Sequence, residues 1–274
     1  MYRDVLVHVN DGEGDRHLVE FAVDLTTRFR AHLNGLHVTP VADVPPLYKP
    51  SQIATAVCRR SAALASDALA ARLAFETLAV ARLASTAWFA TVGAVAEGVA
   101  ARARYADPVI IGQGEWQEPV ERHPRPVAHS VAMLCGRPVL LVPAGITSAE
   151  FTRIAVAWDG SREAVRAIHD AIPLLRSATT VHLLTVVKES DDLAAADAKA
   201  LIAHLANHEI SAESVVLRAA VADEHKALYA SVEQGAYDLL VMGAYSHARW
   251  VEFIFGGATR SMLQSSNIPV LVSH

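Results

Sequence analysis

The residues best suited to chemistry lie near the C-terminal end of the chain, where Gly256 and Gly257 stand next to each other. An apolar run at 239–242 predicts a buried strand before them, a loop opens at Gly243, and a second apolar strand starts at Pro269. A helix that begins at paired glycines lets a ligand approach bare backbone, and its unpaired N–H groups suit phosphate. Glycines at this spacing are also ordinary turn residues, so phosphate binding is one of two interpretations.

An internal repeat organises the chain around this stretch. The segment DPVIIG at 107–112 parallels DLLVMG at 238–243. The same number of residues separates Gly112 from Pro138 and Gly243 from Pro269, and a Pro-Val-Leu strand follows in both places. An ungapped match over this distance predicts two copies of one domain.

The front halves of the two copies agree as well. Apolar strands at 4–9 and 154–158 each precede a helix with apolar residues at helical spacing, and second strands follow at 33–38 and 181–187. Strands that alternate with helices predict parallel sheets with helices on both faces, an α/β doubly wound fold. Further helices are expected at 52–83, 94–105, 193–207 and 224–234, and further strands at 88–92 and 214–217.

The length of 274 residues suits two domains, which we place at 1–147 and 148–274. The linker between the copies, 144–150, is too short to act as a loose tether, so we expect the two copies to pack as an internal pseudo-dimer.

Bulk composition excludes several functional classes. The net charge is −5 and no long run of like charges occurs, which disfavours a nucleic-acid partner. Cys58 and Cys135 are far apart, so neither a disulfide framework nor a metal pair is indicated. The longest apolar tract without a charge, 83–96, is shorter than a membrane span needs, and we expect a soluble cytoplasmic protein without membrane partners.

The stretch 238–274 resembles the C-terminal signature of the universal stress protein family, Gly-x2-Gly-x9-Gly-(Ser/Thr) followed by a helix and a Pro-Val-Leu-Val strand. Gly243 and Gly256 match the first and third glycines. Ser246 stands at the second glycine, and Gly257 stands at the hydroxyl residue. The resemblance extends over both copies and implies two flavodoxin-like, adenine nucleotide alpha hydrolase-like domains in tandem.

The resemblance also implies a site for ATP or a related adenine nucleotide, with Mg²⁺, in the second copy. It places Asp159 near the ribose and the backbone of Val186 against the adenine, although an Asp in this position is also typical of a helix cap. Thr259 and Arg260, one turn beyond the glycines, could add a hydroxyl and a cation to the phosphates. The expected nucleotide-binding residues are Asp159, Val186, Gly243, Ser246, Gly256, Gly257, Ala258 and Thr259.

The first copy is expected to carry a degenerate site. In the same register its signature positions are Gly112, Glu115, Arg125 and Pro126. Glu115 would bring negative charge towards a phosphate, and Pro126 lacks the N–H that a phosphate cradle needs. The sequence therefore predicts at most one competent site, in the second copy.

Three functions remain open on the sequence alone. The first is a nucleotide-binding sensor or regulator of the stress response, the second an interaction scaffold of the same fold without nucleotide, and the third an enzyme such as an adenylyl transferase, for which Arg260 is the one hint. We expect no enzyme, because no Walker loop, HExxH motif or general base is recognisable and the histidines lack metal-ligand spacing. The strands at 139–142 and 270–273 are candidate edges for pairing between units or chains, and a regulatory protein partner is expected but not identified.

Overall fold

The computed structural model describes residues 1–41, 50–83, 85–113, 117–118, 125–187, 193–219, 224–244 and 266–274. Contacts within the chain define two compact units. The N-terminal unit contains Tyr2–Cys135 and Ala144–Ala149, and the C-terminal unit contains Gly136–Pro143 and Glu150–His274 together with Met1. Among the described residues, no helix has the length and apolar character that crossing a membrane requires.

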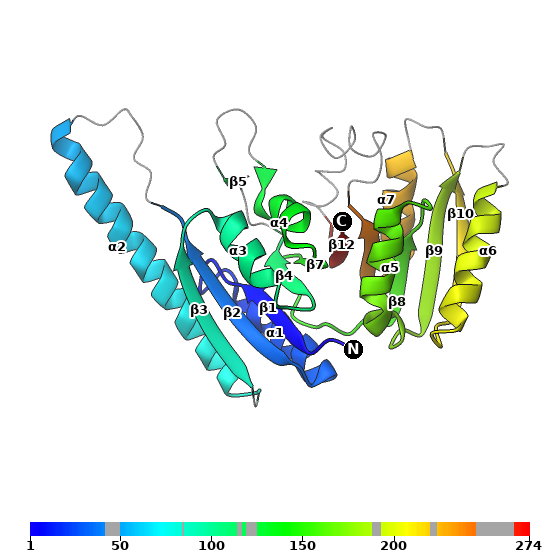
Figure 1. The fold of residues 1–274 in the computed structure, drawn as a ribbon, viewed down its shortest axis with the longest axis horizontal. Coiled ribbons are helices and arrows are strands. Elements are labelled where there is room, and N and C mark those ends of the chain that lie inside the picture. Colours follow the sequence, from blue (N-terminus) through cyan, green and yellow to red (C-terminus); the bar gives the residue numbers. More distant parts are fainter. Residues whose placement is uncertain are drawn as a thin grey trace. The chain divides into compact units, whose positions relative to one another are not determined.

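The N-terminal unit is a four-stranded parallel sheet in the order β4-β1-β2-β3, with helices packed on it (Figure 1). The first three strands are each followed directly by a helix along the chain, as the alternating pattern predicts, and β4 is followed by a short strand pair and then by a helix. Its elements are β1 (Asp4–His8), α1 (Arg16–Phe29), β2 (His32–Thr39), α2 (Pro50–Phe75), the π-helical segment η1 (Glu76–Val80), β3 (Thr86–Val92), α3 (Val95–Ala103), β4 (Val109–Gly112), the short pair β5 (Gln117–Glu118) and β6 (Arg125–Pro126), and α4 (Val127–Cys135).

The C-terminal unit has the strand order β10-β9-β8-β11-β12-β7. All of its strand pairs are parallel except the last, in which β7 runs antiparallel to β12 with Leu140 opposite Leu271. Its elements are β7 (Val139–Val142), β8 (Arg153–Ala157), α5 (Arg162–Leu175), β9 (Thr180–Val187), α6 (Leu193–Ala206), β10 (Ala212–Arg218), α7 (Glu224–Gln234), β11 (Leu239–Gly243) and β12 (Val270–Ser273).

The strand β7 closes the first copy in sequence, yet it belongs to the C-terminal compact unit because it pairs with β12. The two strands that the sequence marks as candidate edges are therefore paired with each other. The division at residues 147 and 148 remains a prediction about the sequence repeat. The compact units differ from it mainly by β7, and also by Met1 and by residues 148–149.

In both copies of the repeat the first and fourth strands along the chain are neighbours in the sheet. The strand order reverses its direction between these two strands. Leu6 of β1 lies opposite Val109 of β4, and Ile154 of β8 lies opposite Leu239 of β11. Runs of Val, Ile and Leu in these strands are buried on both faces, as central parallel strands require. The α/β fold with parallel sheets is thus confirmed, and each unit has a switch point of the kind at which ligands bind.

One aspartate in each unit fixes the start of the fourth strand to the start of the first. Asp107 accepts a hydrogen bond from the backbone N–H of Asp4 at 3.1 Å. Asp238 accepts one from the backbone N–H of Arg153 at 3.0 Å. These matching contacts establish that Asp4 and Arg153 are structural counterparts, as the sequence repeat predicts.

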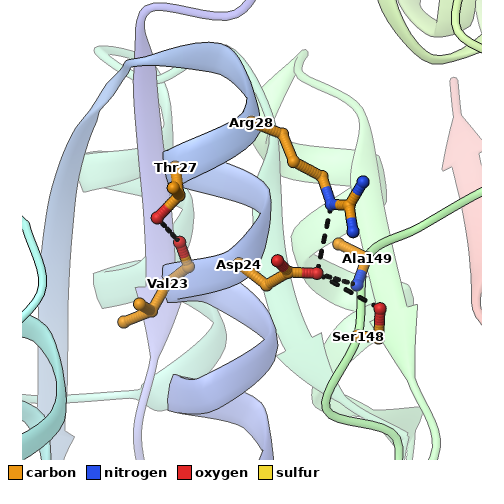
Figure 2. A network of polar contacts seen from close by, with 6 residues as sticks. All are labelled: Val23, Asp24, Thr27, Arg28, Ser148 and Ala149. Carbon is orange, nitrogen blue, oxygen red and sulfur yellow. Dashed lines mark hydrogen bonds and ion pairs between the residues drawn. The ribbon is translucent and has the colours of Figure 1, made fainter.

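The segment Ala144–Ala149, which follows β7, is held on helix α1 of the N-terminal unit (Figure 2). One carboxylate oxygen of Asp24 accepts from the backbone N–H of Ala149 at 2.8 Å and from the hydroxyl of Ser148 at 3.2 Å. The same oxygen accepts from Arg28 Nε at 3.2 Å. Two donors of this segment, Ser148 and Ala149, are therefore held by one carboxylate of α1, in agreement with the expectation that the segment is no loose tether.

Helix α2 reaches the N-terminal core mainly through its last turns. The predicted long helix is observed as α2 continued by η1. Phe75 is 1% exposed and its ring centroid lies 5.2 Å from that of Trp88, whereas Leu69 on the same helix is 59% exposed. Both rings cover Gly35 of β2, where a Cβ atom would lie only 2.6 Å from Trp88 and 2.7 Å from Phe75. The glycine therefore gives the two rings room to pack on the strand.

Candidate functional site

A hollow in the C-terminal unit lies where β8, β9 and β11 end, at the switch point. Three predicted site residues, Asp159, Val186 and Gly243, are brought together there from three separate strand ends. The other five predicted residues lie outside the described residues, so their roles remain predictions; they are Ser246, Gly256, Gly257, Ala258 and Thr259. The full lining comprises Ala157, Trp158, Asp159, Ala164, Leu184, Val186, Leu228, Met242 and Gly243.

The hollow is small and largely apolar. Water can enter about 40 Å³ of it, and the open space at its mouth brings the total to about 440 Å³. Leu184, Leu228 and Met242 contribute apolar walls, and the indole N–H of Trp158 is buried without an acceptor among the described residues. An apolar slot with a few polar groups at its rim suits the edge of a flat ring better than it suits an anion.

Asp159 shapes the loop at the rim of the hollow. Its Oδ1 accepts from the backbone N–H of Ser161 at 3.0 Å, and Ser161 Oγ in turn accepts from the backbone N–H of Ala164 at 3.1 Å. Ser161 is therefore the N-cap of α5, and Asp159 supports the turn before it. The carboxylate of Asp159 remains exposed at the rim.

Gly243 is required by a close approach between β11 and α5. A Cβ atom at this position would lie 2.5 Å from the backbone nitrogen of Ala164 and 2.6 Å from the carbonyl carbon of Glu163. Both distances are far below van der Waals contact, and the obstacles are backbone atoms. The first glycine of the signature thus has a packing role here, which sequence reasoning assigned to ligand contact alone.

Glu163 is a buried carboxylate in the first turn of α5 that sequence reasoning missed. It is 4% exposed and accepts a hydrogen bond from Arg162 Nε at 2.5 Å. Burial by itself raises the pKa of Glu163, but the hydrogen bonds from Arg162 and from its own backbone N–H, with the charges of Arg162 and His274, lower the pKa below its ordinary value. The sequence feature that could have indicated Glu163 is an acidic residue two positions after a serine that can cap a helix.

The lowered pKa of Glu163 predicts a pH-dependent contribution to stability. A carboxyl group whose pKa is lower in the folded state stabilises the fold above its unfolded pKa of about 4.3, and this contribution disappears as the pH falls through the folded value. We expect wild type to be more stable than Glu163→Gln at neutral pH, with a difference that shrinks below about pH 4.3. Urea denaturation of both proteins across this range measures it, and a difference that grows on acidification would contradict the assignment.

The equivalent loop of the N-terminal unit is closed by the protein itself. Asp15 Oδ2 accepts from the backbone N–H groups of Asn10 at 2.7 Å and Asp11 at 2.9 Å. A Cβ atom on Gly12 would lie 2.5 Å from the backbone carbonyl of Ala70, because α2 packs directly over this loop. Backbone amides that could face a ligand are thus occupied by an internal carboxylate.

The other signature positions of the first copy are only partly described. Gly112 ends β4, and Arg125 and Pro126 form β6, whereas Glu115 lies outside the described residues.

Three histidine rings that sequence reasoning treated separately or overlooked gather between α5 and α6. The ring centroids of His169 and His204 are 5.3 Å apart, and those of His204 and His208 are 4.9 Å apart. The spacing of four residues between His204 and His208 was the available signal. Across the described parts of the chain, no group of three His, Cys, Asp or Glu side chains is arranged to hold a metal ion.

The sequence of the C-terminal unit is similar to those of known proteins. Residues 150–274 match the model of the Universal stress protein family. Universal stress protein Slr1230 of Synechocystis sp. (strain ATCC 27184 / PCC 6803 / Kazusa) is 27% identical over 171 residues, which is 60% of this chain. The matched region spans 57% of that relative's length.

Solved structures extend the similarity in fold to nearly the whole chain. A universal stress protein from Archaeoglobus fulgidus DSM 4304 is similar with a TM-score of 0.68 and 18% identity, over 98% of this chain and 95% of that one. A putative universal stress protein from Pseudomonas aeruginosa UCBPP-PA14 has a TM-score of 0.54 and 14% identity, over 99% of this chain and 93% of that one. Residues 150–274 therefore match the model of the universal stress protein family, and nearly the whole chain is similar in fold to a solved universal stress protein.

Proposed function

We propose that the chain is a tandem universal stress protein whose C-terminal unit binds ATP or a related adenine nucleotide as a sensor or regulator of the stress response. The observation that carries the proposal is the convergence of Asp159, Val186 and Gly243 on one hollow at the switch point. These residues are distant in sequence, and the sequence alone predicts all three as site residues. Their convergence supports a nucleotide site at this position.

The described residues suit the adenine end of the ligand. Val186 precedes the last residue of β9, so its backbone lies at the rim, and Leu184, Leu228 and Met242 offer an apolar wall to the ring. Asp159 places an exposed carboxylate where a ribose hydroxyl could donate. The phosphates, with Mg²⁺, would depend on Ser246, Gly256, Gly257, Ala258 and Thr259, whose backbone N–H groups supply the donors in this proposal.

Features of the N-terminal unit support the proposal that each chain has a single nucleotide site, in the C-terminal unit. Its corresponding loop is covered by α2 and its amides hold the carboxylate of Asp15. A binding stoichiometry of one nucleotide per chain follows from this arrangement.

Calorimetric titration of the full chain with ATP and Mg²⁺ tests the proposal. We expect saturable binding near one site per chain, weakened at least about tenfold by Gly256→Asp, because a carboxylate at the glycine would repel phosphate. Arg125→Asp is the matched control, since Arg125 occupies the same register in the degenerate copy and should leave the affinity unchanged.

The alternative is an interaction scaffold of the same fold that binds no nucleotide. The closed loop of the N-terminal unit favours it for that half of the chain. A flat titration at several millimolar ATP, with the protein fully folded, would establish the scaffold and end the nucleotide proposal.

A further inference from the structure

The N-terminal unit contains a second hollow, at the end of its sheet where the strands begin. Water can enter about 260 Å³ of this space, compared with about 40 Å³ in the hollow of the C-terminal unit. Its walls come from one face of three neighbouring strands and from the end of α3. The lining residues are Asp4, Leu6, His32, Asn34, Ala87, Phe89, Arg102, Tyr105 and Ala106.

The same place in the C-terminal unit is filled by protein. The ring of Tyr237 is 7% exposed, and its hydroxyl lies 2.7 Å from His182 Nδ1. The guanidinium carbon of Arg153 lies 5.4 Å from the centre of the tyrosine ring, and Glu213 approaches His182 to 3.9 Å. In the C-terminal unit, the ring of Tyr237 therefore occupies this space, between Arg153 and His182.

The repeat explains why the N-terminal unit is hollow here. The aspartates at 107 and 238 make equivalent contacts, so the residues just before them, Ala106 and Tyr237, are counterparts. The strand registers extend the correspondence, because β1 pairs with β2 as β8 pairs with β9. Two side chains that occupy this place in the C-terminal unit have smaller counterparts: Tyr237 corresponds to Ala106 and His182 to Asn34. Glu213, an exposed residue beside His182, corresponds to Ala87.

Charged groups of opposite sign line this hollow. The guanidinium carbon of Arg102 lies 3.4 Å from the centre of the Phe89 ring, and no described carboxylate forms an ion pair with it. Asp4 Oδ1 accepts from Asn34 Nδ2 at 3.3 Å, which leaves the carboxylate charge unpaired by any described cation. The hollow therefore offers a cation, a carboxylate and an aromatic surface.

We propose that this hollow binds a small zwitterion that carries an aromatic ring, the chemistry of a free aromatic α-amino acid. The ring occupies the space that Tyr237 fills in the C-terminal unit. The ligand carboxylate pairs with the guanidinium of Arg102, a strong charge-assisted contact, and the ligand ammonium group pairs with Asp4 and with the side-chain oxygen of Asn34. This site is separate from the proposed nucleotide site and does not depend on it.

Titration of the full chain with L-tyrosine, L-phenylalanine and tyramine tests the proposal. We expect both amino acids to bind, and tyramine to bind at least about tenfold more weakly because it lacks the carboxylate. Equal binding of tyramine and tyrosine would overturn the role of Arg102, and the absence of binding by both amino acids at several millimolar would overturn the site itself.

Two variants and one control substitution sharpen the test. Ala106→Tyr restores the side chain present in the C-terminal unit, so we expect the protein to stay folded and to lose amino-acid binding at least about tenfold, with ATP binding unaltered. Arg102→Gln should weaken L-tyrosine at least about tenfold and leave tyramine unchanged, whereas Arg82→Gln, outside the hollow, removes the same charge without effect. Wild-type affinity in Ala106→Tyr, or a loss in Arg82→Gln equal to that in Arg102→Gln, would refute the assignment.

Discussion

Replacement of Gly243 by alanine is expected to destabilise the C-terminal unit by about 2–3 kcal/mol, at the upper end of typical overpacking costs. The added methyl group would lie 2.5 Å from the backbone nitrogen of Ala164. This backbone cannot move away cheaply, because Ser161 caps the helix at Ala164 and the neighbouring Glu163 is buried. Urea denaturation of the full chain, followed by signals of both units, measures the loss.

Gly14→Ala is the matched control for this substitution. A Cβ atom at Gly14 also meets a short contact, 2.9 Å, but with Oδ2 of the exposed side chain of Asp11, which can rotate away. We expect a change of no more than about 0.5 kcal/mol there. Equal stability of Gly243→Ala and Gly14→Ala would show that α5 can retreat from β11, and the packing role of Gly243 would then be wrong.

Truncation of Phe75 to alanine should cost the N-terminal unit about 3–5 kcal/mol, as expected for a fully buried aromatic ring. Phe75 is 1% exposed and packs with Trp88 over Gly35, so its loss leaves a cavity between α2 and the sheet. Because the described side chains of α2 are mostly exposed before its last turns, the helix should also undock. Hydrogen exchange of the α2 amides, together with urea denaturation, reports both effects.

Leu69→Ala tests whether α2 is held on the sheet by the buried ring of Phe75 or by its own helical stability. Leu69 lies on the same helix but is 59% exposed, so its truncation should change stability by no more than about 0.5 kcal/mol and leave amide exchange in α2 unchanged. If both variants accelerated exchange equally, α2 would be held by its own helical stability and not by the ring at its end.

Periodicity and the internal repeat allowed most of the fold to be predicted. The helix expected at 224–234 is observed as Glu224–Gln234, and the strand expected at 239–242 is observed as Leu239–Gly243. These segments have strong local patterns, and the same order of strands and helices recurs in both copies of the repeat. The antiparallel pairing of β7 with β12 could not be predicted in this way, since an apolar strand carries no local signal of its partner or direction.

The candidate site was predictable in part. Asp159, Val186 and Gly243 lie at or just after the ends of β8, β9 and β11, and the order of parallel strands brings such ends together. The packing of Gly243 against α5 and of Gly12 against α2 depends on contacts between segments distant in sequence, which spacing does not reveal. The glycines at 256 and 257 lie outside the described residues, so their role in phosphate binding stays a prediction.

The antiparallel contact between β7 and β12 joins two strands of one polypeptide, with Val139 opposite Val272. In an assembly of separate chains such a contact would weaken on dilution, whereas here the covalent connection keeps the two strands at a constant effective concentration. Separation of the copies at the genetic level would leave β12 as an open edge, ready to recruit a strand from another molecule. Fusion of the two copies therefore makes this strand pairing independent of how abundant the protein is in the cell.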